Sequence, residues 1–124
     1  MVTDKPWGWE EEVVVNYNGR DPITVKILFI KAGEMTSMQY HKNRDEKIKV
    51  LSGMIKVDTM IDDKTTSEKI LIDKNLELLI PRMMRHRLEA VEDAKILEII
   101  YGRYNPNDII RISDKYGRVK HKVD

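Results

Sequence analysis

The sequence contains no cysteine among its 124 residues. Disulfides and thiolate metal ligands are therefore excluded, and any metal ion must be held by nitrogen and oxygen atoms. The sequence also lacks an apolar run long enough to span a bilayer and has no signal peptide at its start. We accordingly expect a cytoplasmic protein with no membrane association.

An excess of charge of either sign is missing as well. Lys and Arg number 22 and Asp and Glu number 21, which gives a formal net charge of +1. Bulk electrostatics therefore offers no reason to expect nucleic acid or a membrane surface as a partner, although a local patch would still suit an anionic small molecule.

The length and the apolar content predict one compact domain. Hydrophobic residues make up 41% of the chain, which is enough for a core, and 124 residues divided between two cores would leave each of them marginal. We expect a single domain over residues 1–124, with its core at about 5–118 and a flexible tail at 119–124.

Helical periodicity is largely missing, and an alternation of period two takes its place. Turn residues such as Ser52-Gly53 and Asp62-Asp63-Lys64 separate the alternating segments. The sequence predicts strands at 23–30, 35–41, 46–51, 54–60, 69–72, 76–80, 86–91 and 94–101. Because they follow one another without a crossover helix, they favour an all-β antiparallel sandwich or barrel. Residues 105–116 are expected to form at most one short helix or an ordered loop.

Four side chains are candidates for a metal site. Gln39 and His41 are two residues apart on a predicted strand, so they point to the same face. Glu46 shares the parity of Ile48, which is expected to face the core. A buried carboxylate is costly unless it has a partner, and a cation is one such partner. His86, at the start of a later strand, can supply a fourth ligand.

Taken singly, a strand histidine is more often a surface or hydrogen-bonded residue than a ligand, and Glu46 alone would usually be a solvated charge. The joint spacing changes this balance. Five residues separate Gly33 from Gln39, one separates Gln39 from His41, four separate His41 from Glu46, and six separate Glu46 from Gly53. This spacing resembles the first sequence motif of the cupin superfamily.

The second cupin motif is kept only in part. Pro81 and His86 keep its register, but Met83 stands at a position where the family has glycine, and the usual upstream glycine is Asn75. A glycine at such a position allows a positive φ, so Met83 predicts an altered turn or local strain. In the first motif, Ile48 replaces a residue that is often tryptophan and is expected to reshape the pocket wall.

A closer resemblance extends over nearly the whole chain, from Lys5 to Arg118. The segments that carry it are Lys5-Pro6-Trp7-Gly8, Ser37-Met38-Gln39-Tyr40-His41 with Arg44, Ile80-Pro81, His86-Arg87-Leu88, Asp108-Ile109-Ile110-Arg111 and Asp114-Lys115-Tyr116-Gly117-Arg118. They resemble type II phosphomannose isomerases, which are also the C-terminal cupin domains of bifunctional mannose-1-phosphate guanylyltransferases. The resemblance implies an antiparallel double-stranded β-helix, the jelly-roll-like barrel of the cupins.

The resemblance also implies a function. Gln39, His41, Glu46 and His86 would hold one divalent ion, with zinc first and cobalt, manganese or nickel as alternatives. The reaction would interconvert mannose 6-phosphate and fructose 6-phosphate. Four arginines in or near the family-like segments are expected to bind the sugar phosphate: Arg44, Arg87, Arg103 and Arg111. The sequence does not identify the acid or base, for which Tyr101 and Tyr104 are candidates.

Other readings of the same residues stay open. The chain could be a non-catalytic metal- and sugar-binding cupin, or a cupin that acts on a nucleotide sugar. An iron-dependent oxygenase is less compatible with a Gln39 ligand, because such enzymes more often use three histidines, or two histidines and one carboxylate. Exposed sheet edges favour a homodimer. No nucleotidyltransferase domain fits in 124 residues, so a separate nucleotidyltransferase is a candidate partner.

Overall fold

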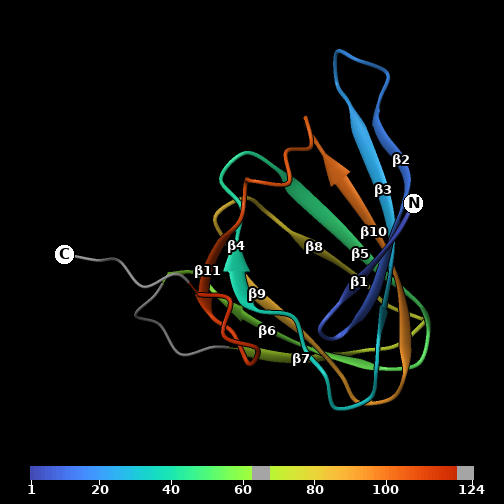
Figure 1. The fold of residues 1–124 in the computed structure, drawn as a ribbon, viewed down its shortest axis with the longest axis vertical. Coiled ribbons are helices and arrows are strands. Elements are labelled where there is room, and N and C mark those ends of the chain that lie inside the picture. Colours follow the sequence, from blue (N-terminus) through green and yellow to red (C-terminus); the bar gives the residue numbers. More distant parts are fainter. Residues whose placement is uncertain (63–67, 120–124) are drawn as a thin grey trace.

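The structure is a computed structural model that describes residues 1–62 and 68–119. Two antiparallel sheets face each other and enclose the interior of a barrel (Figure 1). The strands of the described residues are β1 (Val2–Lys5), β2 (Gly8–Tyr17), β3 (Ile23–Ile30), β4 (Met38–Tyr40), β5 (Asp45–Ser52), β6 (Ile55–Met60), β7 (Glu68–Ile72), β8 (Glu77–Ile80), β9 (Arg85–Ala90), β10 (Ala94–Tyr101) and β11 (Ile110–Ser113). Within these ranges, no helix has the length and apolar character needed to cross a membrane.

The first sheet has the strand order β1-β2-β3-β10-β5-β8 and the second has the order β11-β4-β9-β6-β7. Several neighbouring strands in the sheets are far apart in sequence, such as β3 and β10 or β6 and β9. Every pairing within the two sheets is antiparallel. The expected all-β antiparallel architecture is therefore confirmed.

The alternation in the sequence locates most of the strands. The predicted strands at 23–30 and 94–101 coincide with β3 and β10, and the other six overlap β4 to β9. The largest difference is at β4, which begins at Met38 instead of Met35. Most of the predicted turn at 62–64 and most of the predicted tail at 119–124 lie outside the described residues.

Three strands were not predicted. In β2, the run Glu10 to Glu12 interrupts the apolar alternation, and the strand is held instead by its ladder with β3. β1 in turn pairs with β2. Residues 105–116, expected to be a short helix or an ordered loop, form a loop followed by β11, because β11 extends the second sheet by pairing with β4. Pairing with a distant strand leaves little trace in the local sequence.

The inner face of the barrel follows the parity of the strands. On β5, Glu46, Ile48 and Val50 are buried, which confirms the predicted orientation of Glu46, whereas Lys49 is exposed. The apolar inner residues form one cluster that is completed by Trp7: Leu28, Ile30, Ile48, Val50, Ile55, Val57, Ile72, Ile80, Leu88, Ala90, Ala94 and Ile96. Burying one such large side chain contributes about 1.5–3 kcal/mol, so this cluster is the main source of stability.

Two glycines are required by close approach of another strand. A Cβ atom at Gly53 would lie 2.2 Å from the backbone oxygen of Asp93, and φ there is +82°. A Cβ atom at Gly8 would lie 1.9 Å from the backbone oxygen of Phe29. Any side chain at either position would force the backbone apart, so Gly53 closes the predicted tight turn between β5 and β6 for a steric reason.

Candidate metal centre

Three side chains from two distant parts of the chain come together where the two sheets face each other. His41 follows β4 and His86 lies on β9, both in the second sheet, whereas Glu46 lies on β5 in the first. One ligand atom from each of the three lies within 4.8 Å of the other two, and all three residues are buried. The His41 Nε2 atom is 2.7 Å from the Glu46 Oε1 atom. Such a cluster has the donors that a divalent ion of the zinc type prefers.

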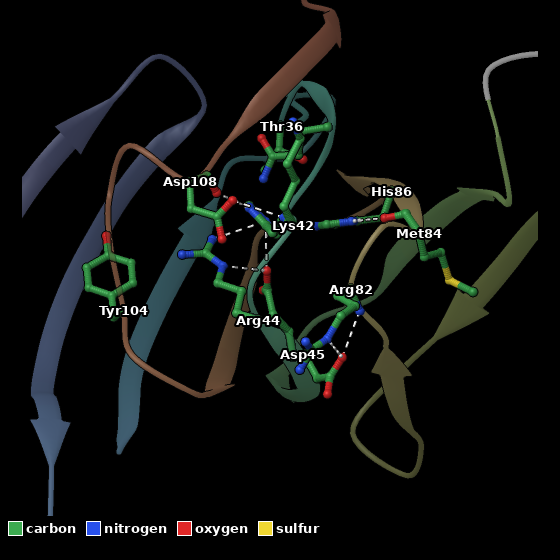
Figure 2. A network of polar contacts seen from close by, with 12 residues as sticks. Thr36, Lys42, Arg44, Asp45, Arg82, Met84, His86, Tyr104 and Asp108 are labelled. Carbon is green, nitrogen blue, oxygen red and sulfur yellow. Dashed lines mark hydrogen bonds and ion pairs between the residues drawn. The ribbon is translucent and has the colours of Figure 1, made fainter. Parts of the chain in front are cut away.

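The backbone holds both histidines with the same ring nitrogen directed into the cluster. His41 Nδ1 lies 2.7 Å from the backbone oxygen of Asp108, and His86 Nδ1 lies 3.0 Å from that of Met84 (Figure 2). A ring nitrogen facing a carbonyl oxygen must carry the proton, so Nε2 of a neutral ring keeps its lone pair for a metal ion. Carbonyl groups orient metal-binding histidines in this way in many proteins.

Asp108 ties down the loop that follows His41. Its carboxylate accepts hydrogen bonds from the backbone nitrogens of Lys42 (2.9 Å) and Asn43 (3.0 Å), while its own backbone oxygen receives His41 (Figure 2). The same residue therefore fixes the loop and the imidazole. Nothing in the sequence singles out Asp108 as a positioning residue, apart from its place in a family-like segment.

Gln39 lies beside the cluster on the second sheet. It is directly opposite His86 across β4 and β9, and directly opposite Arg111 across β11 and β4. Residues directly opposite each other on paired strands share a face of the sheet. The Ser37 hydroxyl donates to Gln39 Oε1 at 2.6 Å. Gln39 therefore shares the inner face of the sheet with His86, and its amide oxygen is held by Ser37.

The ionisation states within the centre suit a cation. Burial alone would raise the pKa of the Glu46 carboxyl, but the hydrogen bond with His41 and the neighbouring basic groups, Arg44 among them, hold it far below its ordinary value. Burial lowers the pKa of His86, and the attraction of Glu46 opposes this only in part. The centre therefore offers an ionised carboxylate and a neutral imidazole, which are the forms that bind metal ions.

Arg44 occupies the same buried space. Its Nε atom donates to Glu46 Oε1 at 3.2 Å, and its Nη2 atom lies 3.0 Å from His41 Nε2. The guanidinium also lies over the ring of Tyr104, with 5.3 Å between its central carbon and the ring centre. Arg44 thus contacts both the metal centre and Tyr104 (Figure 2).

A second buried polar group adjoins the first on β3 and β10. Lys26 Nζ donates to the Tyr104 hydroxyl at 2.6 Å and to Glu10 at 3.1 Å. Glu98 is directly opposite Lys26 in the sheet. Burial, and then the negative charge of Glu46, raises the pKa of Glu98 well above its ordinary value. None of Lys26, Glu98 and Glu10 was singled out from the sequence, in which charged residues on strands normally indicate an exposed face.

Members of both groups line one cavity of about 120 Å³, although His41 and Glu46 are not part of its wall. On the same measure of cavity volume, a single water needs roughly 10–15 Å³. The cavity therefore has room for a small organic molecule and not only for an ion. Gln39, His86, Arg44, Lys26 and Tyr104 all contribute to its wall. Ile48 points inward as predicted, but it belongs to the apolar cluster and does not line this cavity.

The structure separates the four predicted substrate-binding arginines into two pairs. Arg44 and Arg111 line the cavity. Arg87 lies on the outer face of β9, where its Nη2 atom is 2.5 Å from a carboxylate oxygen of the buried Asp58. The reason is parity, since Arg87 follows His86 directly on the strand. Arg103 is exposed and its Nη2 atom lies 3.5 Å from the backbone oxygen of Gly19.

The two candidate tyrosines also lie at different places in the structure. Tyr104 lines the cavity, whereas Tyr101 is 38% exposed at the end of β10 and borders a different hollow, together with Arg103 and Pro22. Of the two, only Tyr104 can contact a ligand in the cavity.

Met83 has the backbone conformation that its position predicted. Its φ is +71°, in the left-handed region that favours glycine. Its backbone nitrogen donates to the His41 backbone oxygen at 2.8 Å, and its own oxygen accepts a bond of 2.6 Å from Arg85 Nη1. The unusual turn therefore links the loop after His41 to the start of β9, which carries His86.

The chain is similar to part of several longer bacterial proteins. It is 31% identical over 118 residues to a mannose-1-phosphate guanylyltransferase of Escherichia coli strain K12, covering 93% of this chain and 23% of that protein. It is 35% identical over 117 residues to the alginate biosynthesis protein AlgA of Pseudomonas aeruginosa, covering 92% and 22%. The chain thus spans less than a quarter of the length of either relative.

Among solved structures, oxalate decarboxylase from Bacillus subtilis superposes with a TM-score of 0.79 at 18% identity, covering 97% of this chain and 32% of that one. At this identity the likeness shows the fold alone, and it confirms the cupin barrel. Residues 2–114 match the family described as mannose-6-phosphate isomerase C-terminal. This chain therefore belongs to the mannose-6-phosphate isomerase C-terminal family of the cupins.

Proposed function

We propose that the chain is a metal-dependent isomerase that interconverts mannose 6-phosphate and fructose 6-phosphate. The observation that carries the proposal is the convergence of His41, Glu46 and His86, with both histidines oriented by backbone carbonyls, beside a cavity lined by His86 and by cationic side chains. Two imidazoles, a carboxylate and the Gln39 amide fit a zinc-type ion, with cobalt, manganese and nickel as alternatives. Magnesium and calcium fit less well, because they prefer oxygen ligands.

The reaction moves a proton between adjacent carbons and builds negative charge on oxygen. A divalent ion, when bound, would act as a Lewis acid on the sugar carbonyl. Arg44 and Lys26 place two positive charges on the cavity wall, where they would stabilise developing negative charge. Tyr104, whose hydroxyl is held by Lys26, is the candidate that we retain for proton transfer.

A nucleotide-sugar-binding cupin is the second candidate. The relative from Escherichia coli strain K12 is named for guanylyl transfer to mannose 1-phosphate, and the cavity wall carries Lys5 and Arg118 in addition to the predicted arginines. These extra cations would suit the diphosphate of a nucleotide sugar as well as the phosphate of a simple sugar.

The test is a coupled assay for fructose 6-phosphate formed from mannose 6-phosphate. Metal-stripped protein is assayed before and after addition of zinc, cobalt, manganese or nickel. We expect turnover that depends on the metal and is lost in His41→Ala, while Lys47→Gln, on the outer face of β5 next to Glu46, keeps it. Metal bound stoichiometrically without any turnover would contradict the isomerase and favour the second candidate, to be checked by binding of GDP-mannose.

We also propose a homodimer formed through the first sheet. β1 pairs with β2 only as far as Glu11, so the rest of β2 is an outer edge beyond β3. Val13, Val14 and Val15 on this edge are 50%, 38% and 44% exposed, which is unusual for three consecutive valines in a monomer. Light scattering should give the mass of a dimer, and Val14→Lys should reduce it to that of a monomer.

A further inference from the structure

The loop that follows β10 is held by a side chain from β2. Asn16 lies near the end of β2, and Tyr104 lies in the loop 88 residues later. The Tyr104 backbone nitrogen donates to Asn16 Oδ1 at 2.7 Å, and Asn16 Nδ2 donates to the Tyr104 backbone oxygen at the longer distance of 3.4 Å. One amide side chain thus binds both backbone polar groups of a single residue, as a paired strand would. The two bonds together fix the position and the rotation of the Tyr104 backbone.

A β-bulge in β2 brings Asn16 to this loop. The register of β2 with β3 shifts between Val14 and Tyr17, so that the two residues between them are opposite Thr24 alone. The Asn16 backbone nitrogen donates to the Thr24 hydroxyl at 3.0 Å, and the φ angle of Asn16 is +50°. Asparagine tolerates this left-handed conformation better than most residues, and bulges often redirect a side chain next to a functional site. Regular pairing is therefore interrupted at the residue whose side chain reaches Tyr104.

The side chain of Tyr104 is held at its other end, in the cavity. Lys26 Nζ donates to the Tyr104 hydroxyl at 2.6 Å and lies 4.2 Å from the centre of the ring. Tyr104 belongs to no strand and is only partly buried. A tyrosine on such a loop would lose conformational freedom when a ligand binds, unless it is already held. The contacts with Asn16 and Lys26 impose this order when the chain folds.

The contact with Asn16 is one of three that hold the loop. The Gly102 backbone nitrogen donates to the Pro22 backbone oxygen at 3.0 Å, and Asp108 binds the loop after His41. Tyr104 lies between these two points, so Asn16 restrains the middle of the segment. Asn16 itself does not line the cavity. Its effect on a bound ligand is therefore exerted through Tyr104.

We propose that Asn16 is a positioning residue, which holds Tyr104 so that the tyrosine hydroxyl faces a ligand in the cavity. The proposal rests on the proposed function only for the reaction in which this hydroxyl takes part. Loss of Asn16 leaves the metal centre and the cationic side chains of the cavity in place. It is therefore expected to affect turnover more than binding.

The first experiment measures kcat and KM for mannose 6-phosphate in the zinc-loaded chain. Asn16→Ala should lower kcat by about 10- to 100-fold with little change in KM, because a misplaced reacting group costs about this much. Asn16→Asp keeps an acceptor for the Tyr104 nitrogen and should lie between. Asn18→Ala is the matched control, since Asn18 lies in the same hairpin and also has a positive φ, +70°. This control should turn over like the unchanged chain.

A double-mutant cycle shows whether Asn16 acts through the tyrosine hydroxyl. Asn16→Ala should lower kcat in the unchanged chain but have no further effect in Tyr104→Phe. An equal fall in both backgrounds would mean that Asn16 supports the fold alone, and this result would overturn the proposal. An unchanged kcat in Asn16→Ala would overturn it as well.

Amide hydrogen exchange, followed by NMR, tests the positioning without any turnover. Exchange of the Tyr104 N–H should be about tenfold faster or more in Asn16→Ala, which lacks its acceptor, and the same as in the unchanged chain in Asn18→Ala. If exchange rises in this way but no variant forms fructose 6-phosphate, the positioning role stands and the isomerase proposal fails. Equal exchange in Asn16→Ala and the unchanged chain overturns the positioning role, whether or not fructose 6-phosphate forms.

Discussion

The interior of the barrel has two halves built on the same strands. On β3, the inner residues Leu28 and Ile30 belong to the apolar cluster, whereas Thr24 and Lys26 are equally buried but polar. On β10, Ile96 is apolar and Glu98, the next inner residue, is a carboxylic acid. We call these the apolar half and the polar half.

The two halves have opposite energetic roles. Each apolar side chain stabilises the fold when it leaves water, whereas each buried charge costs free energy that its partners only partly return. In the polar half, Glu46, His41 and Arg44 are held by one another and by backbone groups. A chain selected for stability alone would fill this space with apolar residues. The polar half is therefore the part of the molecule best explained by ligand binding.

The sharpest way to separate the halves is to remove a proposed metal ligand. We expect His86→Ala to lose stoichiometric zinc binding, because an oriented imidazole is replaced by a methyl group. The measurement is metal content after dialysis, with circular dichroism to show that the fold persists. Arg87→Ala, the next residue on β9, is the control. Equal metal content in His86→Ala and the unchanged chain would contradict this assignment.

Truncation in the apolar half should show the reverse pattern. Ile96→Ala is expected to lower the free energy of unfolding by about 2–5 kcal/mol, since it leaves a cavity among fully buried neighbours. Urea denaturation measures this change. Leu71→Ala, 58% exposed on β7, should change stability by no more than about 0.5 kcal/mol. Zinc binding should persist in Ile96→Ala under folding conditions, and its loss would mean that the two halves are not independent.

The support of the metal centre should have a smaller effect than its ligands. Asp108→Ala removes two hydrogen bonds to the loop after His41, so we expect metal affinity to fall by about 10- to 100-fold. Competition with a chromogenic chelator gives the affinity. Asp108→Asn keeps acceptor capacity and should lie closer to the unchanged chain. Identical affinities for all three proteins would show that the loop needs no such restraint.

The strained turn between β8 and β9 offers a gain in stability. Met83→Gly should raise the free energy of unfolding by about 1 kcal/mol, because a residue with a Cβ atom is disfavoured at φ +71°. The entropy of the added glycine in the unfolded chain reduces this gain. Met84→Gly, at an ordinary φ, should be destabilising in the same urea assay. A loss of stability in Met83→Gly would show that the methionine side chain contributes more than its backbone strain costs.

The smallest effect concerns acid and the ion pair between Arg118 and Asp114. The hydrogen bond from Arg118 lowers the pKa of Asp114 although burial opposes it. The folded state therefore prefers the ionised carboxyl, so this contribution is present above the ordinary pKa of aspartate, near 3.8, and is lost as the pH falls through the lower folded value. Asp114→Asn should be less stable than the unchanged chain at pH 6, and the difference should shrink below pH 3.8. A difference that does not depend on pH would contradict the ion pair.

The strands could be predicted where a long run of mostly apolar residues lies between turn residues. β3 and β10 satisfy this condition and matched residue for residue, and the shared parity with Ile48 correctly predicted that Glu46 faces inward. The condition fails at β11, whose four residues are held by pairing with β4. The alternation within a segment does not show that the segment pairs with a distant strand, because the pairing depends on the partner strand as well.

For the site, the sequence by itself selected the donors Gln39, His41, Glu46 and His86 through their spacing and their resemblance to a family, and alternation decided which of them share a face. Only the tertiary structure decided which other polar residues join them. Parity alone did not show that Lys26 and Glu98 are buried, since a charged residue on a strand is normally exposed. The physical reason is that a residue joins the site only if its strand lies beside the strands that carry the other site residues. The strand order of the two sheets determines this, and it depends on the whole chain.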